Sequence, residues 1–382
     1  MSDTERLSVV YELRLPVDLP PTAAEDAARA VAVEQSVEMP VEAIRDRHVR
    51  DHVVGRLEDL TPLGVDGATR RWSAVISLAT STVGEDPVQL LNMLAGNVSL
   101  HDHVRLTDLT LPSSLLARFD GPARGLDGLR SLVGIDPVAP RALTCTAIKP
   151  QGLAVEDLAA IGEAFALGGV DIVKDDHGIA DPDLDTFTVR VRACQDAVER
   201  ANRVTGGTTR YAPNLIGPPD VLRRKAEIAL ELGVRVVLVA PMLVGVGAFV
   251  DLVRSTLAPA GAATLGHPAA GGTTAVAPEV LLGSLFRLFG ADAVIFPNHG
   301  GRFSFTRDRC ATIAAAARRP WGEMRPALPT PAGGITPDRV EELVAFYGRD
   351  VMLLVGGALL LAGDALTAST ADFVSRVHAV RR

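Results

Sequence analysis

Lysine is rare in this chain, and the positions of its few lysines suggest chemistry. Of 38 cationic residues, only Lys149, Lys174 and Lys225 are lysine. Arginine can replace lysine where a positive charge is enough, but a guanidinium group keeps its proton at any relevant pH. Lys149 and Lys174 each end a short apolar run, so we interpret them as amines that a reaction needs. Lys225 stands beside Arg223 and Arg224 in a helical pattern, and we expect it on a solvated helix face.

The run Lys174-Asp175-Asp176-His177 has the composition of a metal site. Hard oxygen ligands suit Mg²⁺, and a lysine that carries a carbamate adds a further anionic group. A divalent ion at this place would polarise a substrate carbonyl and stabilise an enediolate. The alternative is a structural cluster of ion pairs at a strand end. We predict a magnesium site formed by Lys174, Asp176 and His177.

The pattern from residue 141 onward predicts the scaffold that positions these residues. Eight short β-branched runs alternate with amphipathic helical stretches, and such repetition favours a closed parallel (β/α)₈ TIM barrel over an open doubly wound sheet. We predict the barrel over residues 123–382, which suits the usual size of this fold. The predicted strands are Ala142–Ile148, Val170–Lys174, Thr209–Leu215, Arg235–Ala240, Ala262–Gly266, Ala291–Phe296, Ala327–Ala332 and Asp350–Val355.

The first part of the chain has a different pattern. Strand and helix signals follow each other without the βα rhythm, and we predict a smaller α+β domain of ferredoxin-like type over residues 1–122. The predicted strands are Leu7–Leu15, His52–Leu57, Arg71–Ser77 and Val104–Leu111, and the predicted helices are Thr22–Val33 and Pro87–Ala95.

Catalytic residues of barrel enzymes lie at the carboxyl ends of the strands and in the loops that follow. At these positions we expect His267 to contact the substrate and Asn214, Asn298 and Arg302 to help bind it. Paired glycines follow the last two strands, where barrel enzymes usually bind phosphate through backbone N–H groups and helix N-termini. We predict a phosphate site formed by Gly333, Gly334, Gly356 and Gly357.

Composition limits the environment and the partners of the protein. The net charge is −8 and no basic stripe occurs, so we expect no nucleic-acid partner. The most apolar stretch, residues 234–253, is interrupted by Pro241, Gly245 and Gly247, so we interpret it as strand, loop and helix and expect no membrane span. Three scattered cysteines and a polar opening segment predict a reducing cytoplasm.

Two of these motifs resemble a known family. The segment Thr146-Ala147-Ile148-Lys149-Pro150 resembles the first active-site lysine motif of the RuBisCO large subunit. The segment from Gly168 to Asp176, GGVDIVKDD, is similar to its motif of the carbamylated lysine and the metal ligands. The similarity extends to Gly266-His267, to the glycine pairs, and to Glu34 and Asn97, so it spans nearly the whole chain.

The departures from that family are as informative. True carboxylases carry a lysine in the loop after the sixth strand, where it steadies the attacking CO₂, but residues 300–306 contain none. Gln151 replaces the second lysine of the first motif, Pro268 an arginine, Gly271 a histidine, and His177 the glutamate metal ligand. The chain therefore resembles the RuBisCO-like proteins of form IV, which keep the enolising chemistry and do not fix CO₂.

This resemblance implies roles for several residues. Lys174 would be carbamylated and would bind Mg²⁺ with Asp176, although His177 weakens the site because imidazole adds no negative charge. Lys149 would polarise or protonate the substrate, and the glycine pairs would hold its phosphate. Glu34 and Asn97 would reach the active site of a neighbouring subunit, which implies a homodimer or a larger assembly of dimers.

The function hypothesis is metal-assisted enolisation of a phosphorylated ketose or keto sugar acid, leading to decarboxylation or isomerisation. The 2,3-diketo-5-methylthiopentyl-1-phosphate enolase and the methylthioribulose-phosphate isomerase of methionine salvage are alternatives. Enolases of that group are characterised by lysine at the position of Asn97, which disfavours the first of them. A non-catalytic protein that binds a sugar phosphate, and a barrel aldolase with a Schiff base at Lys149, also remain possible.

Overall fold

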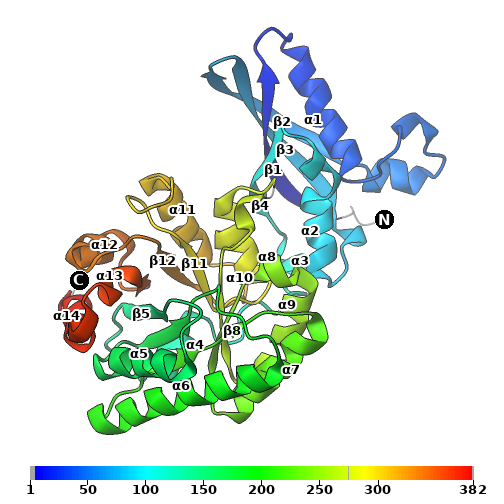
Figure 1. Ribbon diagram of the computed structural model, residues 1–382. Coiled ribbons are helices and arrows are strands. Elements are labelled where there is room, and N and C mark those ends of the chain that lie inside the picture. Colours follow the sequence, from blue (N-terminus) through cyan, green and yellow to red (C-terminus); the bar gives the residue numbers. More distant parts are fainter. Residues whose placement is uncertain (1–4, 274, 381–382) are drawn as a thin grey trace. The chain divides into compact units, whose positions relative to one another are not determined.

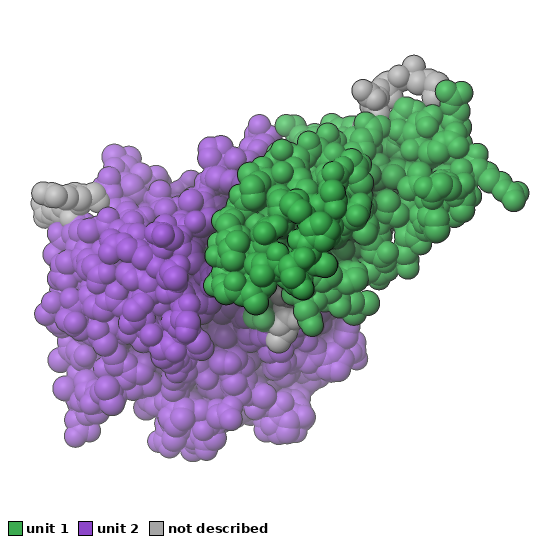
Figure 2. Space-filling model, turned by 90° about the horizontal axis from the view of Figure 1, so that it is seen from above, with its two compact units in different colours: residues 1–119, 271–281 green, residues 120–270, 282–382 purple. Residues whose placement is uncertain are grey.

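The computed structural model describes residues 5–273 and 275–380. They divide into two compact units, distinguished by colour in Figure 2. Unit 1 contains the described residues up to Phe119 together with residues 271–281, and unit 2 contains residues 120–270 and 282–380. The sequence-based boundary lies at residue 122, and the short segment 271–281, which we had expected in the barrel domain, groups with unit 1.

Unit 1 has a βαββαβ arrangement. Its antiparallel sheet has the strand order β2-β3-β1-β4, which confirms the ferredoxin-like prediction. Strand β1 alternates buried and half-buried residues over its first eight positions, so one face of the sheet forms the core. The elements are β1 (Arg6–Pro16), α1 (Thr22–Glu34), β2 (Arg56–Asp66), β3 (Thr69–Ala79), α2 (Pro87–Ala95), β4 (Val104–Thr110) and α3 (Ser113–Leu116).

One strand of unit 1 differs from the prediction. We predicted a strand over residues 52–57, but His52 lies in a helical turn and β2 runs from Arg56 to Asp66. This strand is at the edge of the sheet, and most of its residues are exposed on both faces. An edge strand of this kind does not alternate polar and apolar residues, so periodicity does not reveal it.

Unit 2 is the parallel barrel that the sequence predicts (Figure 1). Its strands are ordered β13-β5-β6-β7 and β8-β9-β10-β11-β12, and contacts of β12 with β13 and of β7 with β9 close the ring. Strands β7 and β8 together occupy the place of one barrel strand, and they are separated only by Pro213, which lacks a backbone N–H. The strands are β5 (Leu143–Ile148), β6 (Ile172–Asp175), β7 (Arg210–Ala212), β8 (Asn214–Leu215), β9 (Val236–Val239), β10 (Ala263–Gly266), β11 (Ala293–Pro297), β12 (Leu328–Ala332) and β13 (Met352–Leu354).

Helices follow the strands, as the βα rhythm predicts. Helix α4 contributes Leu126 and Leu129 to the same apolar cluster as the side chains inside the barrel, so it packs against the barrel interior. The helices of unit 2 are α4 (Gly125–Leu132), α5 (Val155–Leu167), α6 (Leu184–Thr205), α7 (Pro219–Glu231), α8 (Pro241–Val244), α9 (Val246–Leu252), α10 (Phe286–Leu288), α11 (Arg307–Arg318), α12 (Val340–Tyr347), α13 (Gly357–Leu360) and α14 (Leu366–Ala379). Among the described residues, no helix has the length and apolar character that a bilayer crossing requires.

The barrel interior determines which side chains can meet at its mouth. Cys145, Ile172, Leu265 and Leu354 belong to the interior cluster. Successive side chains of a strand point to opposite faces, so residues two or four positions later point the same way. Lys149, Lys174, His267 and Gly356 follow these core residues at even spacing, each at the carboxyl end of its strand.

Candidate active site

Lys149 and Asp176 form the centre of the candidate site. The parallel register pairs Ala147 with Lys174, so the next inward residues of β5 and β6 also lie side by side. The Lys149 ammonium forms an ion pair with the Asp176 carboxylate. Burial raises the pKa of Asp176, but its hydrogen bond with His177 and the charge of Lys149 outweigh burial, so the pKa lies below its ordinary range. Asp176 is therefore ionised at neutral pH.

Lys174 lies deeper in the barrel. It is 3% exposed, and its Nζ donates a hydrogen bond of 2.9 Å to the backbone oxygen of Asp175. Burial lowers the pKa of Lys174, and the charge of Lys149 lowers it further, although Cys145 and Asp176 act in the opposite direction. The two amines are thus close enough to interact, and the neutral form of Lys174 is more accessible than for an ordinary lysine.

His267 and His177 stack on each other at the mouth of the barrel. Their ring centroids are 4.2 Å apart and the planes differ by 15°. The backbone N–H of Ala269 donates to His267 Nδ1 over 3.2 Å, which assigns the proton of the neutral ring to Nε2. Burial, with Lys174 and His177 nearby, lowers the pKa of His267 to about 2. His267 is therefore a neutral hydrogen-bond donor, not a cation.

The donor set fits a magnesium ion only if Lys174 is modified. Asp175 is 1% exposed and its carboxylate accepts three hydrogen bonds within the protein, so it has no role as a ligand. Within the described parts of the chain, no three His, Cys, Asp or Glu side chains gather in a metal-binding arrangement. Asp176 supplies one carboxylate, and His177 Nδ1 lies 3.7 Å from its Oδ1. A carbamate on the neutral Lys174 amine would supply the missing anionic oxygens.

The two asparagines predicted as substrate contacts support the loops instead. Asn214 Nδ2 donates to the backbone oxygens of His177 and Ile179, both over 3.0 Å, and so holds the loop that carries His177. Asn298 is 0% exposed; its Nδ2 donates to the His299 oxygen, and its Oδ1 accepts from the Tyr347 hydroxyl. Asn298 comes directly after the last residue of β11, and its side chain points out of the barrel to Tyr347 of α12. The prediction that Asn298 contacts the substrate is therefore corrected.

The prediction for Lys225 is also wrong. This residue is 4% exposed, and its Nζ donates to the Ile216 oxygen over 3.1 Å. The ammonium group lies 5.2 Å from the centroid of the Phe187 ring. The neighbouring Arg223 and Arg224 do form surface ion pairs, so the charged run spans an exposed and a buried face of α7.

The glycine loops after β11 and β12 lie against each other. A Cβ atom on Gly301 would stand 2.1 Å from the Gly333 oxygen, so only glycine permits this approach. Gly333 and Gly334 have φ angles of +85° and +97°, a region that favours glycine. Arg302 donates its backbone N–H to the Gly333 oxygen over 3.3 Å and is exposed, and the Phe303 ring packs beside Gly333.

The first glycine of the second pair lies next to Lys149. A Cβ atom on Gly356 would be 3.7 Å from Lys149 Cε, and one on Gly357 would meet no atom within 4 Å. Gly357 begins α13, so its backbone N–H has no acceptor within that helix. Gly356 thus lies beside the Lys149 side chain, and the space at Gly357 is open.

Glu34 and Asn97 are brought together in unit 1. Asn97 Nδ2 donates to Glu34 Oε1 over 2.8 Å; Asn97 is exposed and Glu34 is half-buried. Gln35, which the sequence analysis did not single out, fixes this pair: its Nε2 donates to the Met93 oxygen, and its Oε1 accepts from the Val98 backbone N–H. The two predicted partner-facing residues therefore form one preorganised surface group.

Known proteins are similar to this chain in sequence and fold. The family described as ribulose bisphosphate carboxylase large chain, catalytic domain, matches residues 135–292. The ribulose bisphosphate carboxylase-like protein 1 of Rhodopseudomonas palustris is 46% identical over 378 residues, 99% of each chain. The chain belongs to the RuBisCO large-chain family. A 5-methylthioribulose-1-phosphate isomerase of Rhodospirillum rubrum is 48% identical over 98% of this chain and 96% of that protein.

Solved structures place the chain among the RuBisCO-like members of this family. The crystal structure of a RuBisCO-like protein from Rhodopseudomonas palustris has a TM-score of 0.87 and 43% identity over 99% of both chains. The residues agree with this membership, because the loop after β11 carries Arg302 and Phe303 and no lysine that could steady CO₂. The protein is a non-carboxylating RuBisCO-like enzyme.

Proposed function

We propose that this RuBisCO-like enzyme isomerises a phosphorylated ketose through an enediol. The observation that carries the proposal is the convergence of Lys149, Lys174 and Asp176 at one barrel mouth. Isomerisation moves one proton from the carbon beside the carbonyl group to the carbonyl carbon and one proton between the two oxygens, so no oxidant or second substrate is required. Two amines of different environment suit this chemistry, since one can hold a proton while the other accepts one.

The proposed mechanism assigns one role to each side chain. Lys149 donates a hydrogen bond or proton to the carbonyl oxygen of the substrate. The Lys174 side chain, as amine or carbamate, takes a proton from the adjacent carbon and returns it to the former carbonyl carbon. Lys149, having protonated the carbonyl oxygen, takes the hydroxyl proton of the adjacent carbon, which becomes the new carbonyl group of the isomer. His267 donates its Nε2–H to a substrate oxygen without a change of charge. Gly333, Gly334, Gly356 and Gly357 bind the phosphate.

Magnesium belongs to this proposal as an ion held by carbamylated Lys174, Asp176 and His177. When bound, it would polarise the carbonyl group and offset the negative charge of the enediolate. The Lys149 ammonium is paired with the Asp176 carboxylate in the structure. A magnesium ion has to compete with Lys149 for this carboxylate, and a substrate has to compete with Asp176 for the ammonium group.

The proposed substrate is 5-methylthioribulose-1-phosphate or a ketose phosphate of the same class. It is supported by the name of the Rhodospirillum rubrum relative and by its 48% identity over 98% of this chain. The proposed assembly is a homodimer in which Glu34 and Asn97 of one subunit complete the site of the other.

Incubation in D₂O tests the reaction directly. Purified enzyme with 5-methylthioribulose-1-phosphate, followed by ¹H NMR, is expected to give an isomer that carries deuterium on the former carbonyl carbon. Release of CO₂ from a phosphorylated 3-oxo acid, with no exchange into the ketose, would support the decarboxylation hypothesis instead. Binding without exchange or product in either case would sink the enzymatic proposal.

A further inference from the structure

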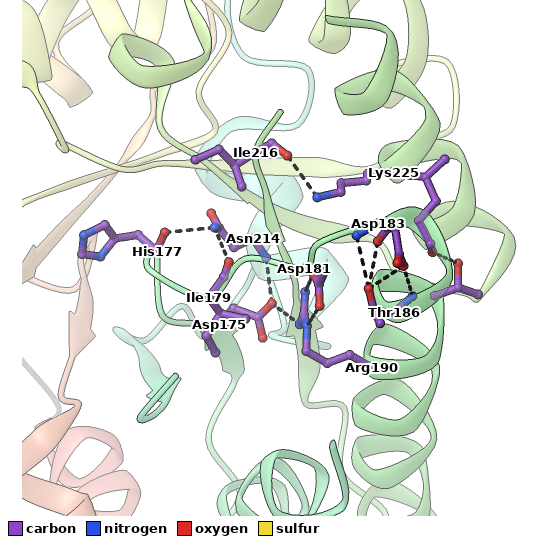
Figure 3. A network of polar contacts seen from close by, with 12 residues as sticks. Asp175, His177, Ile179, Asp181, Asp183, Thr186, Arg190, Asn214, Ile216 and Lys225 are labelled. Carbon is purple, nitrogen blue, oxygen red and sulfur yellow. Dashed lines mark hydrogen bonds and ion pairs between the residues drawn. The ribbon is translucent and has the colours of Figure 1, made fainter. Parts of the chain in front are cut away.

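The loop that carries Asp176 and His177 is attached at both ends to one arginine of helix α6 (Figure 3). Arg190 Nη1 donates to the Asp175 carboxylate at the end of β6 over 2.5 Å. Its Nε and Nη2 donate to the two oxygens of Asp181, both over 2.8 Å. Asp175 and Asp181 stand at the two ends of the loop, so a single guanidinium group binds both ends.

This arginine is part of a buried network, not of a surface ion pair. The side chain of Arg190 is 3% exposed and that of Asp175 is 1% exposed. The Tyr211 hydroxyl accepts a hydrogen bond from Arg190 Nη1 and donates one to Asp175 Oδ1, both part of the same buried cluster. The planar guanidinium group binds one carboxylate with two donors and the other with a third in a fixed geometry, which the compact ammonium group of lysine does not reproduce.

Asn214 holds the middle of the same loop. Its backbone N–H donates to Asp175 Oδ2 over 2.9 Å, and its side-chain amide binds the oxygens of His177 and Ile179. Together with Arg190 it fixes the beginning, middle and end of the segment 175–181. Asp176 takes no part in this buried network, and its side chain points to Lys149 instead.

We propose that Arg190 is a positioning residue of the active site, which sets the place of Asp176 and His177 by holding Asp175 and Asp181 on the outer side of the barrel. It touches no substrate atom and acts through the loop. Its kinetic consequence rests on the proposed function, but its effect on the Lys149–Asp176 pair does not.

The test compares Arg190→Lys and Asp181→Asn with Arg141→Lys. Arg141 binds Asp171 through two hydrogen bonds of 2.7 and 2.8 Å and lies before β5, at the opposite end of the barrel, so it is a matched structural control. Misplacing Asp176 is expected to lower kcat about 10- to 100-fold in the first two variants, with KM unchanged. Arg141→Lys is expected to change the melting temperature but not kcat.

A second measurement does not depend on turnover. Reductive methylation with formaldehyde and cyanoborohydride, resolved by peptide mass spectrometry, reports the reactivity of each lysine, and the native chain has only three. Lys149 is expected to react about fivefold faster in Arg190→Lys and Asp181→Asn than in the wild type, because its ion pair with Asp176 is weakened. In Arg141→Lys its rate is expected to be unchanged.

The outcomes separate the two proposals. If Lys149 reactivity and kcat in Arg190→Lys and Asp181→Asn match those of Arg141→Lys, the positioning role is overturned. If Arg190→Lys does not fold, the milder Asp181→Asn decides the same question. If the wild type converts no phosphorylated ketose, the proposed function fails, and the methylation rates still decide whether Arg190 positions Asp176.

Discussion

Asp175 and Asp176 are neighbours in the chain, yet their carboxylates lie on opposite sides of the barrel wall. Asp176 points inward to Lys149, and Asp175 points outward to Arg190 of helix α6. The alternation of a strand produces this division, because consecutive side chains leave a strand on opposite faces. Asp176 thus faces Lys149 in the candidate site, while Asp175 fixes the strand end that presents Asp176.

Replacement of Lys149 tests its proposed role in proton transfer. Lys149→Ala is expected to lower kcat about 10²- to 10⁴-fold, the usual effect of losing a positioned acid or base. Lys149→Arg keeps the positive charge beside Asp176 but cannot release a proton, so it is expected to remain almost as inactive. Measured isomer formation that is close to wild type in the arginine variant would show that Lys149 contributes charge alone.

Much of this site could be predicted because strand ends in a barrel converge. The spacing of Lys149, Lys174 and His267 relative to their apolar runs located all three at one mouth, and the structure places them there. The alternation of inward and outward side chains along a strand also predicts which residues miss the site. Counting two residues on from the apolar positions of β11 would have directed Asn298 away from the interior, where it binds Tyr347.

Other features depend on contacts that no local pattern contains. Arg190 is one of many arginines in the sequence, and only the packing of α6 against β6 and β7 brings it to Asp175 and Tyr211. Lys225 appears in a charged run, yet the packing of α7 buries it against Phe187. Such tertiary pairings override the preference that local composition suggests.

His267 makes stability depend on pH. Its pKa is about 2 in the folded protein and 6.5 as an ordinary histidine, so between these values the unfolded state binds the extra proton. Stability is therefore lost as the pH falls below 6.5. Between pH 8 and pH 5, the unfolding free energy of the wild type, measured by urea titration, is expected to fall by about 2 kcal/mol relative to that of His267→Gln, because only the unfolded state takes up the proton in this range.

Two results would contradict this account of His267. Its ring proton signals in ¹H NMR are expected to stay constant from pH 5 to 8, so a titration near pH 6 would show that the ring is not desolvated. Equal acid sensitivity of His267→Gln and wild type would lead to the same conclusion.

Carbamate formation on Lys174 predicts dependence on CO₂ and Mg²⁺. The lowered pKa of Lys174 leaves more neutral amine near pH 7 than an ordinary lysine has, and only the neutral amine adds CO₂, so activation is expected to be faster as the pH rises. Removal of Mg²⁺ with EDTA and of CO₂ with CO₂-free buffer is expected to lower the rate of isomer formation at least about tenfold. Bicarbonate and Mg²⁺ together should restore it, with a ¹³C carbamate signal absent from Lys174→Ala; full activity in EDTA would exclude the ion.

Gly334 tests the proposed phosphate seat. In Gly334→Ala, the new Cβ would lie 3.1 Å from backbone atoms of Gly301 and Arg302, at a φ of +97°. The displaced loops are expected to raise KM for the phosphorylated substrate about tenfold or more. Gly348→Ala is the control, because its φ is +80° but no atom lies within 4 Å of the new Cβ. Equal KM values in the two variants would show that the loop of Gly334 does not bind the phosphate.

Mixed dimers test whether Glu34 and Asn97 act in the neighbouring subunit. Asn97→Ala removes the amide that binds Glu34 in unit 1, and Lys149→Ala removes the amine of the barrel, so each variant alone is expected to be nearly inactive. When the two variants are unfolded together and refolded in equal amounts, half of the dimers are mixed and each mixed dimer contains one intact site. Activity on the order of a quarter of the wild type is expected. If the mixture remains as inactive as its components, the pair does not complete a partner's site.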